Sequence, residues 1–150
     1  MKNIFGFVFF LSVVLLLSGC SKSGIEEITP KEAHDKLKNP KNEYVIAISD
    51  LSRAGEEHIY NSKKILEKVA EEKGIKIYYA IYDSNNEKHE KDFDENGKFK
   101  GHTSNFYYAE KGKKVEDMDY KSLGVAESSK VNISAEVLGR FIDQKEEEGF

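Results

Sequence analysis

Apolar and polar positions divide this chain into an uncharged apolar stretch near the N-terminus and a polar remainder with helix and strand patterns. Residues 44–48 form a nearly continuous apolar run, which is typical of a strand buried on both faces. Residues 56–72 repeat apolar side chains at helical spacing, and Gly74 follows where a glycine commonly ends a helix. Residues 75–82 are rich in β-branched and aromatic side chains, which indicates a second strand. The short connections predict a strand-helix-strand unit with parallel strands.

Weaker patterns flank this unit. Thr29-Pro30-Lys31-Glu32 predicts a helix start, because threonine caps, proline suits the first helical position and glutamate follows three residues after the cap. Asn39-Pro40 is expected to end that helix. A third strand over 105–108, a turn over 110–113 and a fourth strand over 114–118 would form a hairpin. Ser134 is expected to cap a last helix, which runs from residue 135 to about residue 146.

The order of these elements predicts an α/β domain with a central mixed sheet of about four strands flanked by helices. It resembles the thioredoxin fold over residues 29–146, best over 44–82 and 103–118. Among bacterial proteins the pattern is similar to small thioredoxin-like proteins of the bacteriocin-transport accessory type. The polar, glycine-containing residues 20–28 are expected to form a tether, and residues 147–150 a short tail.

The resemblance implies a Cys-x-x-Cys motif at the start of the helix after the first central strand, and a cis-proline before the third strand. Two registers place that motif on residues 53–56 or 56–59, and neither contains cysteine. Ser104 stands where the proline would be, and we expect its peptide bond to be trans, because a non-proline cis bond costs ~2.5–4 kcal/mol. Dithiol exchange requires an attacking thiolate and a resolving thiol. We therefore expect no enzymatic activity from this domain and no cofactor.

The chain has one cysteine, Cys20, and it directly follows the apolar stretch in Leu17-Ser18-Gly19-Cys20. With Lys2 at the start, the layout is that of a signal peptide. The cysteine after the small residues resembles the lipobox of bacterial lipoproteins. That resemblance implies that residues 1–19 are removed and that Cys20 becomes a lipid-modified N-terminus without a free thiol. The alternative is a membrane-spanning anchor, because the stretch is near the lower length limit for crossing a bilayer.

Removal of residues 1–19 leaves 131 residues and takes away Lys2, so the net charge changes from −4 to −5. That length favours one domain. A mildly acidic domain is a poor candidate for binding nucleic acid or an anionic membrane surface. We expect a protein anchored through lipid on Cys20 to the outer face of the cell membrane. The lysine-rich, tryptophan-free composition favours a Gram-positive source.

The thioredoxin resemblance also implies a binding edge, where the loop after the first central strand meets the loop before the third. An extracytoplasmic protein or peptide is the expected partner. The alternatives are a capped helix with solvated charges and a component of a thiol-disulfide enzyme that relies on a partner's thiols. The residues expected at this edge are Ser52, Arg53, Glu56, His58, His102, Thr103, Ser104 and Asn105.

Signals for metal binding are weak. His58 and His102 lack the spacing of a metal site. Asp92, Asp94 and Asn96 match the first half of a calcium loop, but Thr103 stands where the bidentate carboxylate belongs. A turn with Asn96-Gly97 at its apex explains the same residues. The sequence therefore predicts no metal site, and a calcium-dependent or metal-dependent envelope module remains an alternative.

Overall fold

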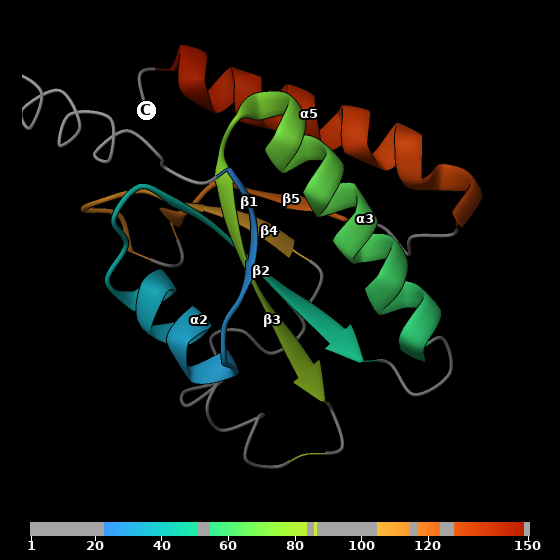
Figure 1. Cartoon of the computed structure of the whole chain (residues 1–150). Helices are drawn as coiled ribbons and strands as arrows, with labels where there is room; N and C mark the ends of the chain where they lie inside the picture. Colours follow the sequence, from blue (N-terminus) through green and yellow to red (C-terminus); the bar gives the residue numbers. More distant parts are fainter. Residues whose placement is uncertain are drawn as a thin grey trace, which may run out of the picture.

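The computed structural model describes residues 23–50, 55–83, 86, 105–114, 117–123 and 128–148. Their strands form a mixed sheet in the order β1-β3-β2-β4-β5, with five strands instead of the expected four or so. Helices α3 and α5 cover one face of the sheet and α2 covers the other (Figure 1). The elements are β1 (Gly24–Glu27), α2 (Pro30–Lys38), β2 (Glu43–Asp50), α3 (Gly55–Lys73), β3 (Lys76–Asp83), β4 (Asn105–Ala109), β5 (Tyr120–Ser122), the 3₁₀ turn η2 (Ser128–Lys130) and α5 (Val131–Glu147).

The central strand-helix-strand unit is confirmed. Strands β2 and β3 are parallel and adjacent, with a register that runs from Tyr44 opposite Ile77 to Asp50 opposite Asp83. Helix α3 ends at Lys73, and Gly74 follows with φ +67°, a left-handed conformation that glycine adopts without strain. The expected first helix is confirmed too. Thr29 accepts a hydrogen bond from the Glu32 backbone N–H at 3.2 Å, and Glu32 accepts one from the Thr29 backbone N–H at 2.8 Å.

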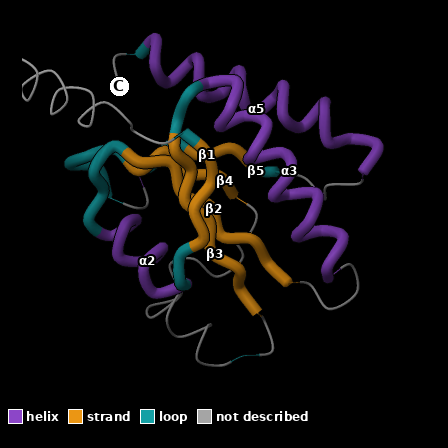
Figure 2. The backbone as a smooth tube through the Cα atoms, viewed as in Figure 1, coloured by secondary structure: helices purple, strands orange, loops and turns teal. Residues whose placement is uncertain are grey.

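Residues 24–27, expected to be part of a tether, instead form the edge strand β1. The strand lies parallel to β3, with Gly24 opposite Lys76. Its ends are fixed by two backbone hydrogen bonds, from Gly24 N–H to the Ile75 carbonyl at 2.9 Å and from Ile28 N–H to the Tyr79 carbonyl at 2.8 Å. The pairing partner lies about fifty residues further along the chain, so local composition carried no sign of it. In Figure 2 β1 runs in front of the other strands, and the strand order places it at the edge of the sheet.

The expected fourth strand over 114–118 is wrong. The turn after β4 forms as predicted, with Lys113 N–H donating to the Glu110 carbonyl at 3.1 Å. A second turn then follows, in which Asp117 N–H donates to the Lys114 carbonyl at 3.0 Å. Because of this second turn, the chain pairs with β4 only later, at β5, where Tyr120 lies opposite Tyr107.

The predicted cap at Ser134 is also wrong. Helix α5 begins at Val131, directly after the η2 turn, so Ser134 lies within its first turns. The N-cap residue, Lys130, makes no side-chain capping hydrogen bond. Val131 packs against the main core cluster. The packing of Val131 extends the helix beyond the capping signal in the sequence.

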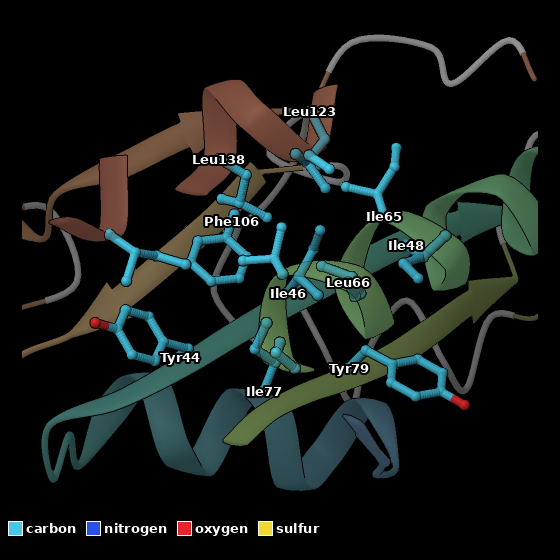
Figure 3. Close-up of a cluster of buried hydrophobic side chains, with 14 of the residues drawn as sticks. Tyr44, Ile46, Ile48, Ile65, Leu66, Ile77, Tyr79, Phe106, Leu123 and Leu138 are labelled. Atoms are coloured by element: carbon cyan, nitrogen blue, oxygen red, sulfur yellow. The ribbon is translucent and has the colours of Figure 1, made fainter. Parts of the chain in front are cut away.

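Two apolar layers hold the fold together, one on each face of the sheet. The larger layer fills the space between the sheet and helices α3 and α5 (Figure 3). Phe106 is fully buried in it, with its ring centroid 5.5 Å from that of Tyr44 and 6.3 Å from that of Phe141. The smaller layer lies between the sheet and α2. Neighbouring strand residues alternate between the layers, so Tyr107 faces α2 and Tyr108 faces α3 and α5.

Candidate functional site

The expected binding edge corresponds to the end of the sheet where β2 stops and α3 starts. Strand β4 is antiparallel to β2, with Phe106 opposite Ile46, so the start of β4 lies at this same end. The structure thus brings Asp50, the first turn of α3 and Asn105 to one end of the molecule. The other expected residues lie outside the described part of the chain: Ser52, Arg53, His102, Thr103 and Ser104, together with Cys20 and the calcium-loop candidates Asp92, Asp94 and Asn96.

Asn105 and His58 belong to opposite faces of the sheet. Asn105 alternates with Phe106 on β4 and so faces the α2 side, where its Nδ2 lies 3.5 Å from Tyr107 Oη. His58 belongs to α3, which covers the other face. Both side chains are buried. The two residues therefore do not form one binding cluster.

His58 begins the buried stripe of α3. Its side chain is only 5% exposed, and its Nε2 has no hydrogen-bond partner among the described residues. Asn61 and Ser62 are buried on the next turn. Within the described residues, no group of three or more histidine, cysteine, aspartate or glutamate side chains is arranged to hold a metal ion. A metal role for His58 finds no support there.

The accessible surface at this end lies on the outer side of α3. A shallow, open pocket of about 570 Å³ runs along the first half of the helix and is lined by Glu56, Glu57, Ile59, Tyr60 and Lys63. Tyr60 is 57% exposed, and Lys64 Nζ lies 4.4 Å from its ring centroid. Glu56 and Glu57 are exposed in the first helical turn, where a negative charge interacts favourably with the helix dipole. We call this surface the α3 pocket.

One side of the α3 pocket is fixed to the edge strand β1. Tyr79 Oη donates a hydrogen bond of 2.6 Å to Glu27 Oε2, and Lys63 Nζ lies 3.3 Å from the same oxygen. The hydrogen bond from Tyr79, followed by Lys63, lowers the pKa of Glu27. Burial and the bond to Glu27 raise the pKa of Tyr79. The network keeps Glu27 charged and holds the Lys63 side chain at the pocket wall.

Sequence reasoning found Glu56 but missed Tyr60, Lys63 and Glu27. Tyr60 had a usable signal, because a large aromatic side chain outside the apolar stripe of an amphipathic helix is expected to face solvent. Glu27 had none, since its segment carries no strand pattern of its own.

No helix in the described part of the chain has the length and apolar character needed to cross a membrane. Comparisons of the chain with protein-family models, with curated proteins and with solved structures give no match.

Proposed function

We propose that the chain is a membrane-anchored extracytoplasmic lipoprotein whose thioredoxin-like domain is redox-inactive and acts as a binding or accessory module. The position of its single cysteine carries this proposal. Cys20 follows the apolar stretch and lies four residues before β1, and the remaining residues, 21–150, contain no cysteine. The placement of the single cysteine thus supports both parts of the proposal: a lipid anchor at Cys20, and a domain without the two thiols that dithiol exchange requires.

The topology supports the thioredoxin-like assignment. Strands β1, β3 and β2 are parallel neighbours, and β4 and β5 continue the sheet in antiparallel order. The parallel β2 and β3, the antiparallel β4 and the helices on both faces are features that the resemblance implies, and β1 adds a fifth strand at the edge. The start of α3, where a thioredoxin-like enzyme would carry its cysteines, presents Glu56, Glu57 and His58 instead.

The shape of the α3 pocket supports a protein or peptide as the partner. Sites for small molecules are usually concave and enclose most of the ligand, whereas this pocket is shallow and open. An exposed tyrosine beside two glutamates suits a segment that carries basic and apolar side chains. The partner would be an extracytoplasmic protein or peptide near the anchored domain.

The anchor is tested by the mass of the protein extracted from membranes of expressing cells. We expect a chain that begins at Cys20 and carries acyl groups, and a Cys20→Ala variant that keeps residues 1–19. A wild-type chain that keeps residues 1–19, or an unmodified Cys20, would contradict the proposal.

Binding is tested by photocrosslinking in intact cells. A photoreactive residue replaces Tyr60 in the α3 pocket, and in a control it replaces Arg140, which is exposed on α5. We expect a discrete crosslinked product from position 60 that is absent from position 140. The additional changes Glu56→Lys and Glu57→Lys should remove it. Identical products from both positions would mean that the α3 pocket is not the binding surface.

A further inference from the structure

The end of the sheet opposite the α3 pocket lies next to the proposed anchor. Gly24 pairs with Lys76, and Glu43 pairs with Ala109, so β1, β3 and β2 start and β4 ends at one end of the domain. Cys20 precedes Gly24 by four residues, which span no more than about 14 Å when fully extended. If Cys20 carries lipid, this end of the domain must therefore lie close to the membrane surface.

Two turns meet at this end and are fastened to each other. One consists of Lys38, the last residue of α2, and residues 39–42, which connect α2 to β2; the other consists of residues 110–114, which follow β4. Asn42 N–H donates to the Ala109 carbonyl at 2.9 Å, and Lys111 N–H donates to Asn42 Oδ1 at 2.8 Å. Asn42 adopts φ +61°, a left-handed conformation that asparagine tolerates better than most residues. We call these two turns the basic turn pair, and Figure 1 shows them together at the left.

The basic turn pair carries four exposed lysines that form no ion pair with any described residue: Lys38, Lys41, Lys111 and Lys114. Other lysines at this end are neutralised. Lys36 pairs with Glu43 at 2.8 Å and Lys113 pairs with Glu110 at 2.6 Å. At this end of the domain the unpaired positive charge therefore lies on the turns, which form a local basic patch on a domain whose net charge is negative.

Acidic residues at the same end occur on both faces of the sheet. On the α2 side, Asp35 and Glu43 lie beside Lys36 and Lys41, and Glu43 pairs with Lys36. Lys36, Lys38 and Lys41 outnumber these two acids. The ion pair between Lys145 and Asp119 places the last turn of α5 at this end, where Glu146 and Glu147 are exposed. Helix α2 and the turn that follows it belong to the opposite face. A negatively charged surface would therefore attract the α2 side of this end and repel the α5 side.

We propose that the basic turn pair binds the anionic phospholipid headgroups of the membrane in which Cys20 is anchored, and so holds the domain in one orientation with its α2 side toward the lipid. The inference rests on the proposed acylation of Cys20. A lipid chain combined with a basic patch is a common two-part membrane attachment. In this orientation the α3 pocket, at the other end of the sheet, points away from the membrane and toward extracytoplasmic partners.

The test uses the acylated protein extracted from membranes, with its mass checked first, so that a failure of acylation is seen separately. It is reconstituted into vesicles of phosphatidylcholine alone or with one third phosphatidylglycerol. Exposed lysines are acetylated with a membrane-impermeant reagent and quantified by mass spectrometry. On the phosphatidylglycerol vesicles we expect acetylation of Lys38, Lys41, Lys111 and Lys114 to slow by about threefold or more, and 0.5 M salt to reverse this.

Matched variants complete the test. One carries Lys41→Gln, Lys111→Gln and Lys114→Gln, and its remaining turn lysine, Lys38, should lose the protection. The other carries the same change at three exposed lysines away from the turns, Lys31, Lys64 and Lys121, and should keep Lys38 protected. Equal acetylation on both vesicle types, or equal protection of turn and distant lysines, would overturn the proposal. So would protection that appears in native envelope membranes but not in pure lipid, because that outcome indicates a protein partner.

Discussion

Replacement of Lys145 by methionine removes a buried ammonium group that ties the end of α5 to the segment between β4 and β5. Lys145 Nζ lies 2.7 Å from Asp119 Oδ2 and 2.6 Å from Glu148 Oε2, and its side chain is only 7% exposed. Methionine keeps the buried apolar stem and fills similar space. The substitution thus tests the charged hydrogen bonds and changes the packing little.

The expected loss is moderate. A hydrogen bond to a charged group contributes about 1.5–3 kcal/mol to stability. Here the Asp119 and Glu148 side chains are 41% and 43% exposed, so each regains water when the lysine is removed. We therefore expect Lys145→Met to lower the free energy of unfolding by about 1–2 kcal/mol, and the melting temperature by on the order of 5 °C.

The pH dependence supplies a second readout. The hydrogen bond from Lys145 lowers the pKa of Asp119 from 3.8, and hydrogen bonds from Lys145 and Gln144 lower that of Glu148 from 4.5. Burial disfavours the charged form of Lys145 and so lowers its pKa. The hydrogen bonds to Asp119 and Glu148 outweigh this effect, and the pKa of Lys145 is raised. Carboxyl groups with lowered pKa stabilise the fold above their unfolded pKa and lose this contribution as pH falls through the folded value. Below pH 4.5 the wild type should therefore lose more stability than Lys145→Met.

Urea unfolding followed by circular dichroism, at pH 7 and at steps below pH 4.5, measures both effects. Arg140→Met on the same helix is the matched control, because Arg140 and Glu136 are 68% and 69% exposed and 3.5 Å apart. Such an exposed pair contributes about 0–1 kcal/mol. Equal losses in the two variants, or parallel acid-unfolding curves for wild type and Lys145→Met, would refute the reasoning.

Three further substitutions test local features. Thr29→Ala removes the side-chain bond to the Glu32 backbone and should cost about 1 kcal/mol in urea unfolding; an unchanged midpoint would show that the cap contributes nothing. Tyr79→Phe removes the 2.6 Å bond to Glu27, so the pKa of Glu27 should rise toward 4.5 in an NMR titration, and a constant pKa would contradict the assigned cause. Gly74→Ala should lower the free energy of unfolding by about 1 kcal/mol, because φ is +67° there even though the space around the position is open. A more stable variant would show that this backbone conformation does not strain alanine.

The parts of the fold that the sequence predicts are those whose signal is local. The capping box of Thr29 and Glu32 lies within four residues, and Gly74 directly follows the helix it ends. The apolar run 44–48 is buried on both faces of the sheet, so its composition alone indicates a strand. In each case the chemistry that forms the element lies within the element itself.

The parts that the sequence missed depend on distant partners. Strand β1 exists because β3 offers it hydrogen bonds, and β5 forms only where the second turn brings Tyr120 opposite Tyr107. The candidate site shows the same limit. The sequence placed His58 and Asn105 correctly at one end of the sheet, but which face each one occupies depends on where α3 and α2 pack.

The parallel pairing of β1 with β3 would have a mechanical consequence if Cys20 is acylated as proposed. A pull from the anchor acts on Gly24 along the axis of β1, whereas a partner held at the start of α3 pulls from the opposite end of the sheet. The two forces slide β1 along β3, so the hydrogen bonds of the strand share the load at once instead of opening one by one. The ion pair of Glu26 with Lys76 and the hydrogen bond from Tyr79 to Glu27 also join β1 to β3. With Cys20 acylated as proposed, this four-residue strand would carry the tension between the anchor and a bound partner.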